Sequence, residues 1–151
     1  ELLFDYILID CPAGIEVGFH RAVSCANEGI VVVSPQLTSI RDADKVISIL
    51  KSYNLNYLNI IVNKIRGELV LSGEMYSAED IENTLKTSLI GVIPEDSKLL
   101  DELVELPSSE SYKAFKILEQ NVSSKQNKIY DYLRKYTGFW GSIRKELKKR
   151  L

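Results

Sequence analysis

The chain has 151 residues, 45% of them hydrophobic and 26% charged, with a formal net charge of −2. This length favours one domain with an ordinary hydrophobic core, and the composition argues against a disordered chain. No run reaches the ~18 apolar residues of a membrane-spanning helix. The two cysteines, Cys11 and Cys25, lack the spacing of a metal or redox site and favour a reduced compartment.

Apolar runs alternate with helical patterns along the chain. Strands are predicted at 6–9, 29–33, 58–62 and 89–93, and helices at 15–26, from 39 to about 50, 77–86, around 97–104 and 109–121. Ser39 with Asp42, and Ser77 with Asp80, have the spacing of a capping box with Asp in place of Glu. A polar loop is expected around Gly67 and Gly73. The alternation predicts an α/β fold, a mostly parallel sheet flanked by helices on both faces.

The first apolar run ends on a single carboxylate. Asp10 follows Tyr6–Ile9 directly, and Pro12 and Gly14 come next. A buried parallel strand would deliver this carboxylate to the sheet edge where ligands of open α/β folds bind. There it could hold Mg²⁺ through a water beside a nucleotide phosphate, and the Gly14 N–H could donate to that phosphate. The alternative is an Asp that caps a turn and a Gly that starts the next helix.

The C-terminal end has the pattern of an in-plane membrane helix. Its apolar side chains fall on one helical face, and its cations fill the other. The apolar residues are Phe139, Trp140, Ile143, Leu147 and Leu151, and the cations are Arg144, Lys145, Lys148, Lys149 and Arg150. Ile129, Leu133 and Tyr136 extend the apolar stripe backwards. The alternative is a core or coiled-coil helix with a solvated face.

Three blocks of the sequence together resemble the MinD family of the deviant Walker A (MinD/ParA) class of P-loop ATPases. They begin at Asp10 (Asp-Cys-Pro-Ala-Gly-Ile-Glu), Ser39 (Ser-Ile-Arg-Asp-Ala-Asp) and Gly91 (Gly-Val-Ile-Pro-Glu-Asp). The resemblance extends from residue 4 to about residue 100. The family's P-loop and signature lysine precede the first of these blocks, so the chain is expected to be the C-terminal part of a longer protein. Alone it is predicted to be inactive.

The resemblance also implies roles for individual residues. Asp10 resembles the Walker B carboxylate and Gly14 the glycine that senses the γ-phosphate. Asn63 and Lys64 match the pair whose Asn contacts adenine, and the segment Pro94, Glu95 and Asp96 lies in the loop that flanks the base. An Asn amide can both donate to and accept from a base edge. Arg41, Asp42 and Asp44 match a segment near the family's dimer interface, although a solvated helix start explains them equally well.

The resemblance implies a function for the whole protein. It would bind ATP with Mg²⁺, dimerise, attach reversibly to anionic lipid on the inner face of the cell membrane, and position the division septum. Its partners would be the septum-inhibitor and topological-regulator proteins of the Min system, with no nucleic acid. The expected organisation is an ATPase part over 1–122, a linker or helix extension over 123–137, and a membrane-targeting helix over 138–151.

The sequence is also compatible with two other functions. A ParA-like partitioning ATPase would use its basic residues on DNA, although the one-sided apolar stripe of the tail argues against a surface built for phosphates. A non-catalytic adaptor would keep the α/β body as a docking surface.

Overall fold

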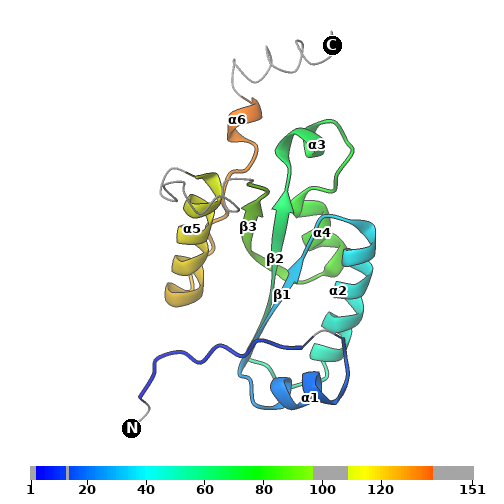
Figure 1. Cartoon of the computed structure of the whole chain (residues 1–151), viewed down its shortest axis with the longest axis vertical. Helices are drawn as coiled ribbons and strands as arrows, with labels where there is room; N and C mark the ends of the chain where they lie inside the picture. Colours follow the sequence, from blue (N-terminus) through cyan, green and yellow to red (C-terminus); the bar gives the residue numbers. More distant parts are fainter. Residues whose placement is uncertain (1–2, 13, 97–108, 138–151) are drawn as a thin grey trace.

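A three-stranded parallel sheet forms the centre of the molecule (Figure 1). The computed structural model describes residues 3–12, 14–96 and 109–137. Strands β1 (Glu28–Val33), β2 (Tyr57–Ile65) and β3 (Ser88–Pro94) lie in the order β1-β2-β3. Parallel neighbours require a crossover between them, and helices supply it here. The predicted α/β fold is confirmed.

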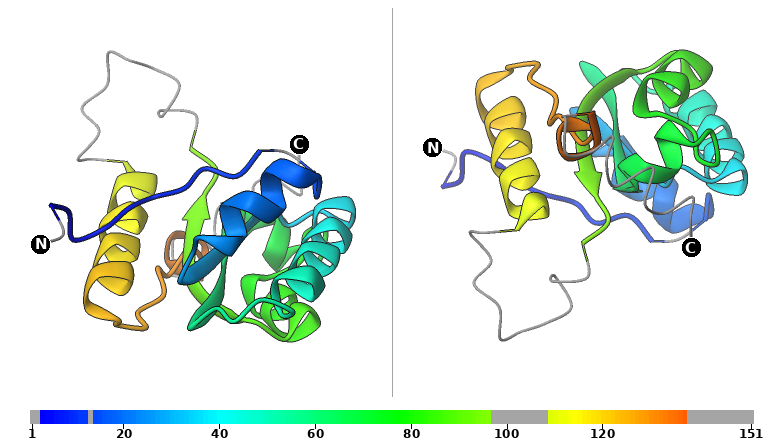
Figure 2. Two further views of the ribbon diagram at one scale, coloured as in Figure 1. Left: turned by 90° about the horizontal axis from the view of Figure 1, so that it is seen from below. Right: turned by 90° about the horizontal axis from the view of Figure 1, so that it is seen from above.

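Helices cover the two faces of the sheet unequally (Figure 2). The helices are α1 (Val17–Ser24), α2 (Leu37–Leu50), α3 (Gly67–Leu71), α4 (Ala78–Leu85), α5 (Glu110–Ser124) and α6 (Arg134–Thr137). Helices α2 and α4 pack on one face, where Ile47, Ile60 and Ile81 belong to the largest buried cluster. Helix α5 packs on the other face over β2 and β3, where Ile61, Ile93 and Ala114 form a smaller cluster.

Among the described residues, no helix packs over strand β1 on the α5 face. Ile30 and Val32 are 42% and 59% exposed, although the alternate residue Val33 is fully buried. Side chains alternate between the faces of a strand, so this pattern means that only one face of β1 is packed. Within the described residues, helices therefore cover both faces of β2 and β3 and one face of β1.

The predicted strand at 6–9 does not form. Residues 3–12 are exposed and without regular structure, and Figures 1 and 2 show this dark blue segment crossing the end of the sheet where the strands begin. The Tyr6 hydroxyl donates a hydrogen bond to the carbonyl of Ser123 at 3.2 Å. A strand needs a neighbour for its backbone N–H and C=O groups, and β1 pairs only with β2 among the described residues.

The two predicted capping boxes have different outcomes. Ser77 and Asp80 form one at the start of α4, with both reciprocal hydrogen bonds present. Helix α2 instead begins at Leu37 after Gln36, so the predicted cap at Ser39 is wrong. The Ser39 hydroxyl accepts a hydrogen bond from the Ser34 backbone N–H at 3.0 Å and thereby holds the turn before the helix.

Residues 125–137, here called the strap, connect the end of α5 to the chain beyond it. Residues 125–133 are not helical, and α6 comprises only Arg134–Thr137. The apolar stripe through Ile129, Leu133 and Tyr136 is therefore not a backward extension of one long helix. The predicted helix around 97–104 and the predicted membrane helix at 138–151 lie outside the described residues.

Candidate functional site at the ends of the strands

The loops that follow β2 and β3 lie together at one end of the sheet. The Glu95 backbone N–H donates to the carbonyl of Ile65 at 2.9 Å, so the two loops are joined directly beyond their strands. Parallel strands bring their carboxyl ends to the same edge, where ligands of open α/β sheets bind. The structure therefore brings together the predicted base-binding residues Asn63, Lys64 and Glu95.

A bulge in β2 shapes this end of the sheet. The register with β3 shifts between Asn63 and Ile65, and the intervening Lys64 has a φ of 59°. The left-handed region is uncommon for a residue other than Gly, and such bulges often re-aim side chains beside functional sites. Half-buried Asn63 uses its Oδ1 to accept the Lys64 backbone N–H at 2.9 Å. This hydrogen bond stabilises the bulge.

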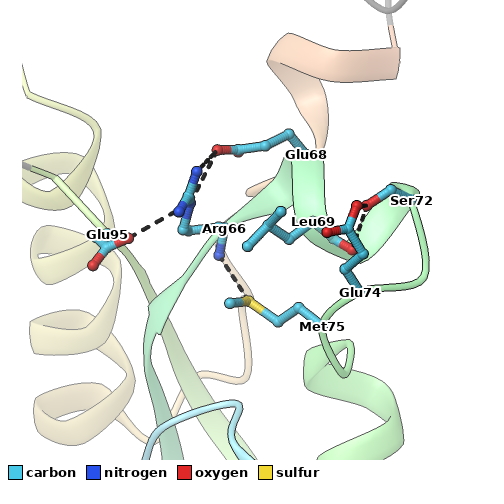
Figure 3. Close-up of polar contacts among 7 residues, drawn as sticks. All are labelled: Arg66, Glu68, Leu69, Ser72, Glu74, Met75 and Glu95. Carbon is cyan, nitrogen blue, oxygen red and sulfur yellow. Dashed lines mark hydrogen bonds and ion pairs between the residues drawn. The ribbon is translucent and has the colours of Figure 1, made fainter. Parts of the chain in front are cut away.

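An arginine bridges the two loops (Figure 3). The Arg66 guanidinium donates to Glu68 Oε1 from Nε at 3.1 Å and from Nη2 at 2.9 Å. Its Nε also lies 3.6 Å from Glu95 Oε2 across the gap between the loops. The hydrogen bond to Glu68 and the charges of both carboxylates raise the pKa of Arg66. One cation thus connects the loop after β2 to the loop after β3.

The turn after α3 contacts the backbone of Arg66. The Arg66 backbone N–H donates to the sulfur of Met75 at 3.3 Å, and Met75 is held by a hydrogen bond from its own N–H to the carbonyl of Leu69. The Ser72 hydroxyl donates a hydrogen bond to Glu74 Oε1 at 2.7 Å (Figure 3). These contacts fold residues 67–75 into a short helix and a turn, where the sequence predicted a polar loop.

The segment after β3 is tied to the start of α5. The Ser111 hydroxyl donates to the carbonyl of buried Pro94 at 3.0 Å, and the Ser111 N–H points to Asp96 Oδ2 at 3.5 Å. Ser109 caps the helix by accepting the Tyr112 N–H at 3.0 Å. Pro94 and Asp96 therefore position α5 as well as the loop, a structural role that the sequence did not indicate.

Two strap tyrosines pack against the same end of the sheet. The Tyr132 hydroxyl accepts the backbone N–H of Ala78, the first residue of α4, at 3.2 Å. The ring of Tyr136 lies so close to Gly67 that a Cβ there would come within 2.6 Å of it. Burial raises the pKa of Glu68, but hydrogen bonds from Tyr136 and Arg66 outweigh this effect and lower it overall.

The predicted dimer-interface residues lie on the surface of α2. Arg41, Asp42 and Asp44 are all exposed, and Asp42 forms an i,i+3 ion pair with Lys45 at 3.1 Å. Both side chains of that pair are 72% exposed. This arrangement is compatible with a contact surface and equally with a solvated helix start.

Asp10 and Gly14 are not brought to the strand-end loops. Asp10 is exposed in the segment that crosses the opposite end of the sheet (Figure 1). Gly14 is exposed with a φ of 87°, and a Cβ added to it would meet nothing within 4 Å. Among the described residues, no three His, Cys, Asp or Glu side chains are grouped to hold a metal ion.

Arg66, Glu68, Tyr132 and Tyr136 are the residues of this site that the sequence reasoning missed. The proximity of Arg66 to the Asn63–Lys64 pair was the available signal, because a cation two residues after Lys64 lies at the same strand end. The tyrosines gave no such signal, since more than 50 residues separate them from the groups they contact.

The proposed membrane-contacting residues, 139–151, lie outside the described residues. Within the part of the chain that the structure describes, none of the helices combines the length and the apolar character needed to cross a membrane.

Comparison with known proteins finds similarity to MinD septum site-determining proteins. No family model matches the chain. It is 47% identical over 97 residues to the septum site-determining protein MinD of Synechocystis sp., an alignment that covers 64% of this chain and 36% of that protein. The structure resembles the MinC:MinD cell division protein complex of Aquifex aeolicus, with a TM-score of 0.74 and 41% identity over 82% of this chain and 53% of that one.

A second solved structure carries a ligand. The MinD of Pyrococcus horikoshii complexed with Mg-ADP matches with a TM-score of 0.66 and 30% identity, over 80% of this chain and 51% of that chain. The chain thus spans about a third of the length of these curated relatives and about half of the length of the solved structures. The resemblance to MinD seen in the sequence is confirmed over this part.

Proposed function

We propose that this chain, homologous to part of the MinD septum site-determining proteins, is the C-terminal part of a membrane-associated ATPase. The complete protein would bind and hydrolyse ATP with Mg²⁺, dimerise, attach reversibly to the membrane, and position the division septum. The observation that carries the proposal is the 47% identity to a MinD over 97 residues. The Mg-ADP in a structural relative supports the choice of nucleotide.

The nucleotide base is assigned to the strand-end loops. Asn63 and Lys64 would contact it from the bulge of β2, and Pro94, Glu95 and Asp96 would flank it from the loop after β3. The joined loops give this assignment its physical support, because one planar ligand can touch both. Asp10 and Gly14 are assigned to the phosphate end only in the complete protein, where the run at 6–9 would have strand neighbours. The isolated chain is expected to be inactive.

The membrane and protein partners are assigned to other surfaces. Residues 139–151 would lie in the headgroup region of anionic lipid on the inner face of the cell membrane. One tail would bind weakly, whereas two tails on an ATP-bound dimer would gain about 10²–10⁴ in avidity. Arg41, Asp42 and Asp44 would contact the second subunit or a septum inhibitor, and the MinC:MinD complex among the structural relatives supports such a partner.

Sedimentation with vesicles tests the membrane assignment. The complete protein should co-sediment with phosphatidylglycerol-containing vesicles in the presence of ATP and Mg²⁺, and much less with ADP. A version ending at residue 137 should stay in the supernatant while still binding ATP. Equal sedimentation of both versions would reject the tail assignment, and retention on DNA instead of vesicles would favour a partitioning ATPase.

An alanine substitution tests the Asp10 assignment. Asp10→Ala in the complete protein should abolish ATP turnover. Asp5→Ala, which removes an exposed carboxylate from the same segment, serves as the matched control and should leave turnover unchanged. Unchanged turnover in Asp10→Ala would reject the role of this carboxylate.

A further inference from the structure

We propose that Arg66 is a positioning residue for the nucleotide base, because its guanidinium fixes the Glu95 side chain at the end of the sheet. The inference rests on the function proposed above, since it requires a base between Asn63 and the loop after β3. It adds to that function a residue that acts on the base through Glu95 instead of through a contact of its own.

The guanidinium of Arg66 contacts carboxylates from two segments (Figure 3). Its Nε and Nη2 lie 3.1 and 2.9 Å from Oε1 of Glu68 in α3, and Nε lies 3.6 Å from Oε2 of Glu95 beyond β3. A guanidinium is planar and carries its donors in a fixed arrangement, so the two contacts with Glu68 set the direction in which it faces Glu95. The position of the Glu95 carboxylate therefore depends on Arg66.

The backbone at this end of the sheet is held by other contacts. The Arg66 N–H donates to the sulfur of Met75 at 3.3 Å, and the Glu95 N–H donates to the carbonyl of Ile65 at 2.9 Å. A substitution of the Arg66 side chain removes neither hydrogen bond. It should therefore leave the two loops joined and release only the Glu95 side chain.

A fixed Glu95 side chain would favour binding of the base. This side chain is 52% exposed, and ordering an exposed glutamate when a ligand arrives costs conformational entropy. Arg66 orders it beforehand and neutralises its charge. Asn63, on the other side of the proposed base position, is likewise held by the hydrogen bond from the Lys64 N–H. Both sides of the proposed base site are thus preorganised.

The binding of two ligands to the complete protein tests the inference. One ligand is ATP, and the other is inorganic tripolyphosphate, which has the phosphate chain without a base. Displacement of fluorescent MANT-ATP in the presence of Mg²⁺ gives the Kd of each. A residue that positions the base should affect ATP alone, whereas a general loss of structure should weaken both ligands.

Arg66→Gln removes the cation and keeps a polar side chain. It should raise the Kd of ATP by about threefold to fivefold, because partly exposed ion pairs make modest contributions. The Kd of tripolyphosphate should stay within about twofold of the wild-type value. Glu95→Gln should also raise the Kd of ATP. The double variant should bind ATP about as well as the weaker single variant, because both substitutions remove the same contact.

Lys116→Gln is the matched control. Lys116 forms a partly exposed ion pair with Glu119 on α5 at 2.9 Å, so this variant also loses one cation and one ion pair. Both of its Kd values should stay within about twofold of the wild-type values.

The outcomes separate this inference from the proposed function. A wild type that does not bind ATP would overturn both. A wild type that binds ATP no more tightly than tripolyphosphate would overturn the base assignment and the role of Arg66 with it.

Three results would overturn the role of Arg66 alone. In the first, Arg66→Gln binds ATP as tightly as the wild type. In the second, it weakens ATP and tripolyphosphate equally. In the third, the effects of Arg66→Gln and Glu95→Gln multiply in the double variant. If tripolyphosphate does not displace MANT-ATP from the wild type, turnover takes its place as the comparison: Arg66→Gln should raise KM for ATP at unchanged kcat, and a fall in kcat at unchanged KM would overturn the role.

Discussion

At the scale of single residues, Asn121 joins three parts of the molecule. It is 4% exposed, and its Nδ2 donates to the carbonyls of Ile90 in β3 and Lys128 in the strap at 2.8 and 2.7 Å. Its Oδ1 accepts the Lys128 N–H at 3.1 Å. One amide thus satisfies backbone groups that would otherwise face a largely buried space without partners.

Asn121→Ala should therefore lower the free energy of unfolding by about 2–4 kcal/mol, because it leaves these backbone groups unpaired. Urea denaturation measures the change. Asn83→Ala, at an exposed position of α4, is the control and should change stability by about 0.5 kcal/mol or less. Equal stability of the two variants would show that water replaces the Asn121 contacts.

Glu110 gives the strap a dependence on pH. Its hydrogen bond from Lys113, and then that from the Tyr130 hydroxyl, lower its pKa. A carboxyl with a depressed folded-state pKa stabilises the fold above its unfolded-state value of about 4.3 and loses this contribution as pH falls through the folded-state value. Glu110→Gln should accordingly lose less stability than the wild type between about pH 5 and pH 3. Parallel stability curves for the two proteins would contradict this prediction.

At the scale of elements, local signals predicted the strands that find a partner strand within the described residues and the helix cap that needs only local contacts. The strands at 28–33, 57–65 and 88–94 coincide with the predicted apolar runs to within a few residues, and the capping box at Ser77 forms as expected. The apolar run at 6–9 has the same pattern and forms no strand, because its hydrogen-bonding partners must come from elsewhere. Helix α3 was missed because it spans only five residues and opens on Gly67.

The capping box at Ser77 should contribute measurably to stability. Ser77→Ala removes the acceptor for the Asp80 N–H and should cost about 1 kcal/mol of unfolding free energy, as N-cap substitutions usually do. Ser48→Ala, on the exposed side of α2, should change it by about 0.5 kcal/mol or less. Thermal unfolding followed by circular dichroism measures both, and a larger loss for Ser48→Ala would contradict the assignment.

The sequence predicted those site residues that directly follow a predicted strand, but not the contacts between distant segments. Asn63 and Glu95 could be placed at one edge because each follows a strand of a parallel sheet. The bridge through Arg66 and the contact of Tyr136 with Gly67 could not, because they depend on how loops and strap fold back across the sheet. The position of Asp10 depended on a strand that does not form here.

At the scale of the whole molecule, large apolar side chains are exposed along the N-terminal segment. Phe4, Ile7 and Leu8 are 70%, 74% and 91% exposed, and β1 has a free hydrogen-bonding edge among the described strands. Exposed apolar side chains next to an unpaired strand edge favour association. The chain by itself should therefore self-associate as its concentration rises.

Sedimentation velocity over a range of concentrations tests this expectation. The double substitution Ile7→Lys and Leu8→Lys should shift the distribution toward the monomer. Leu37→Lys, which replaces a 48% exposed leucine of α2, is the control and should leave the distribution unchanged. A monomeric wild type at every concentration would contradict the prediction.

The bulge at Lys64 has a consequence for the length of the polypeptide. Ile61 and Asn63 follow the alternation of β2, but Ile65 packs into the cluster under α2 and α4 instead of the α5 side, because the bulge adds one residue. Deleting Lys64 would restore the strict alternation and leave Ile65 on the face of that cluster, opposite Pro94, but it would remove the N–H that Asn63 Oδ1 accepts. The extra residue therefore serves the strand-end loops and not the core, because a chain without it would keep Ile65 in place and would lose the left-handed residue beside Asn63.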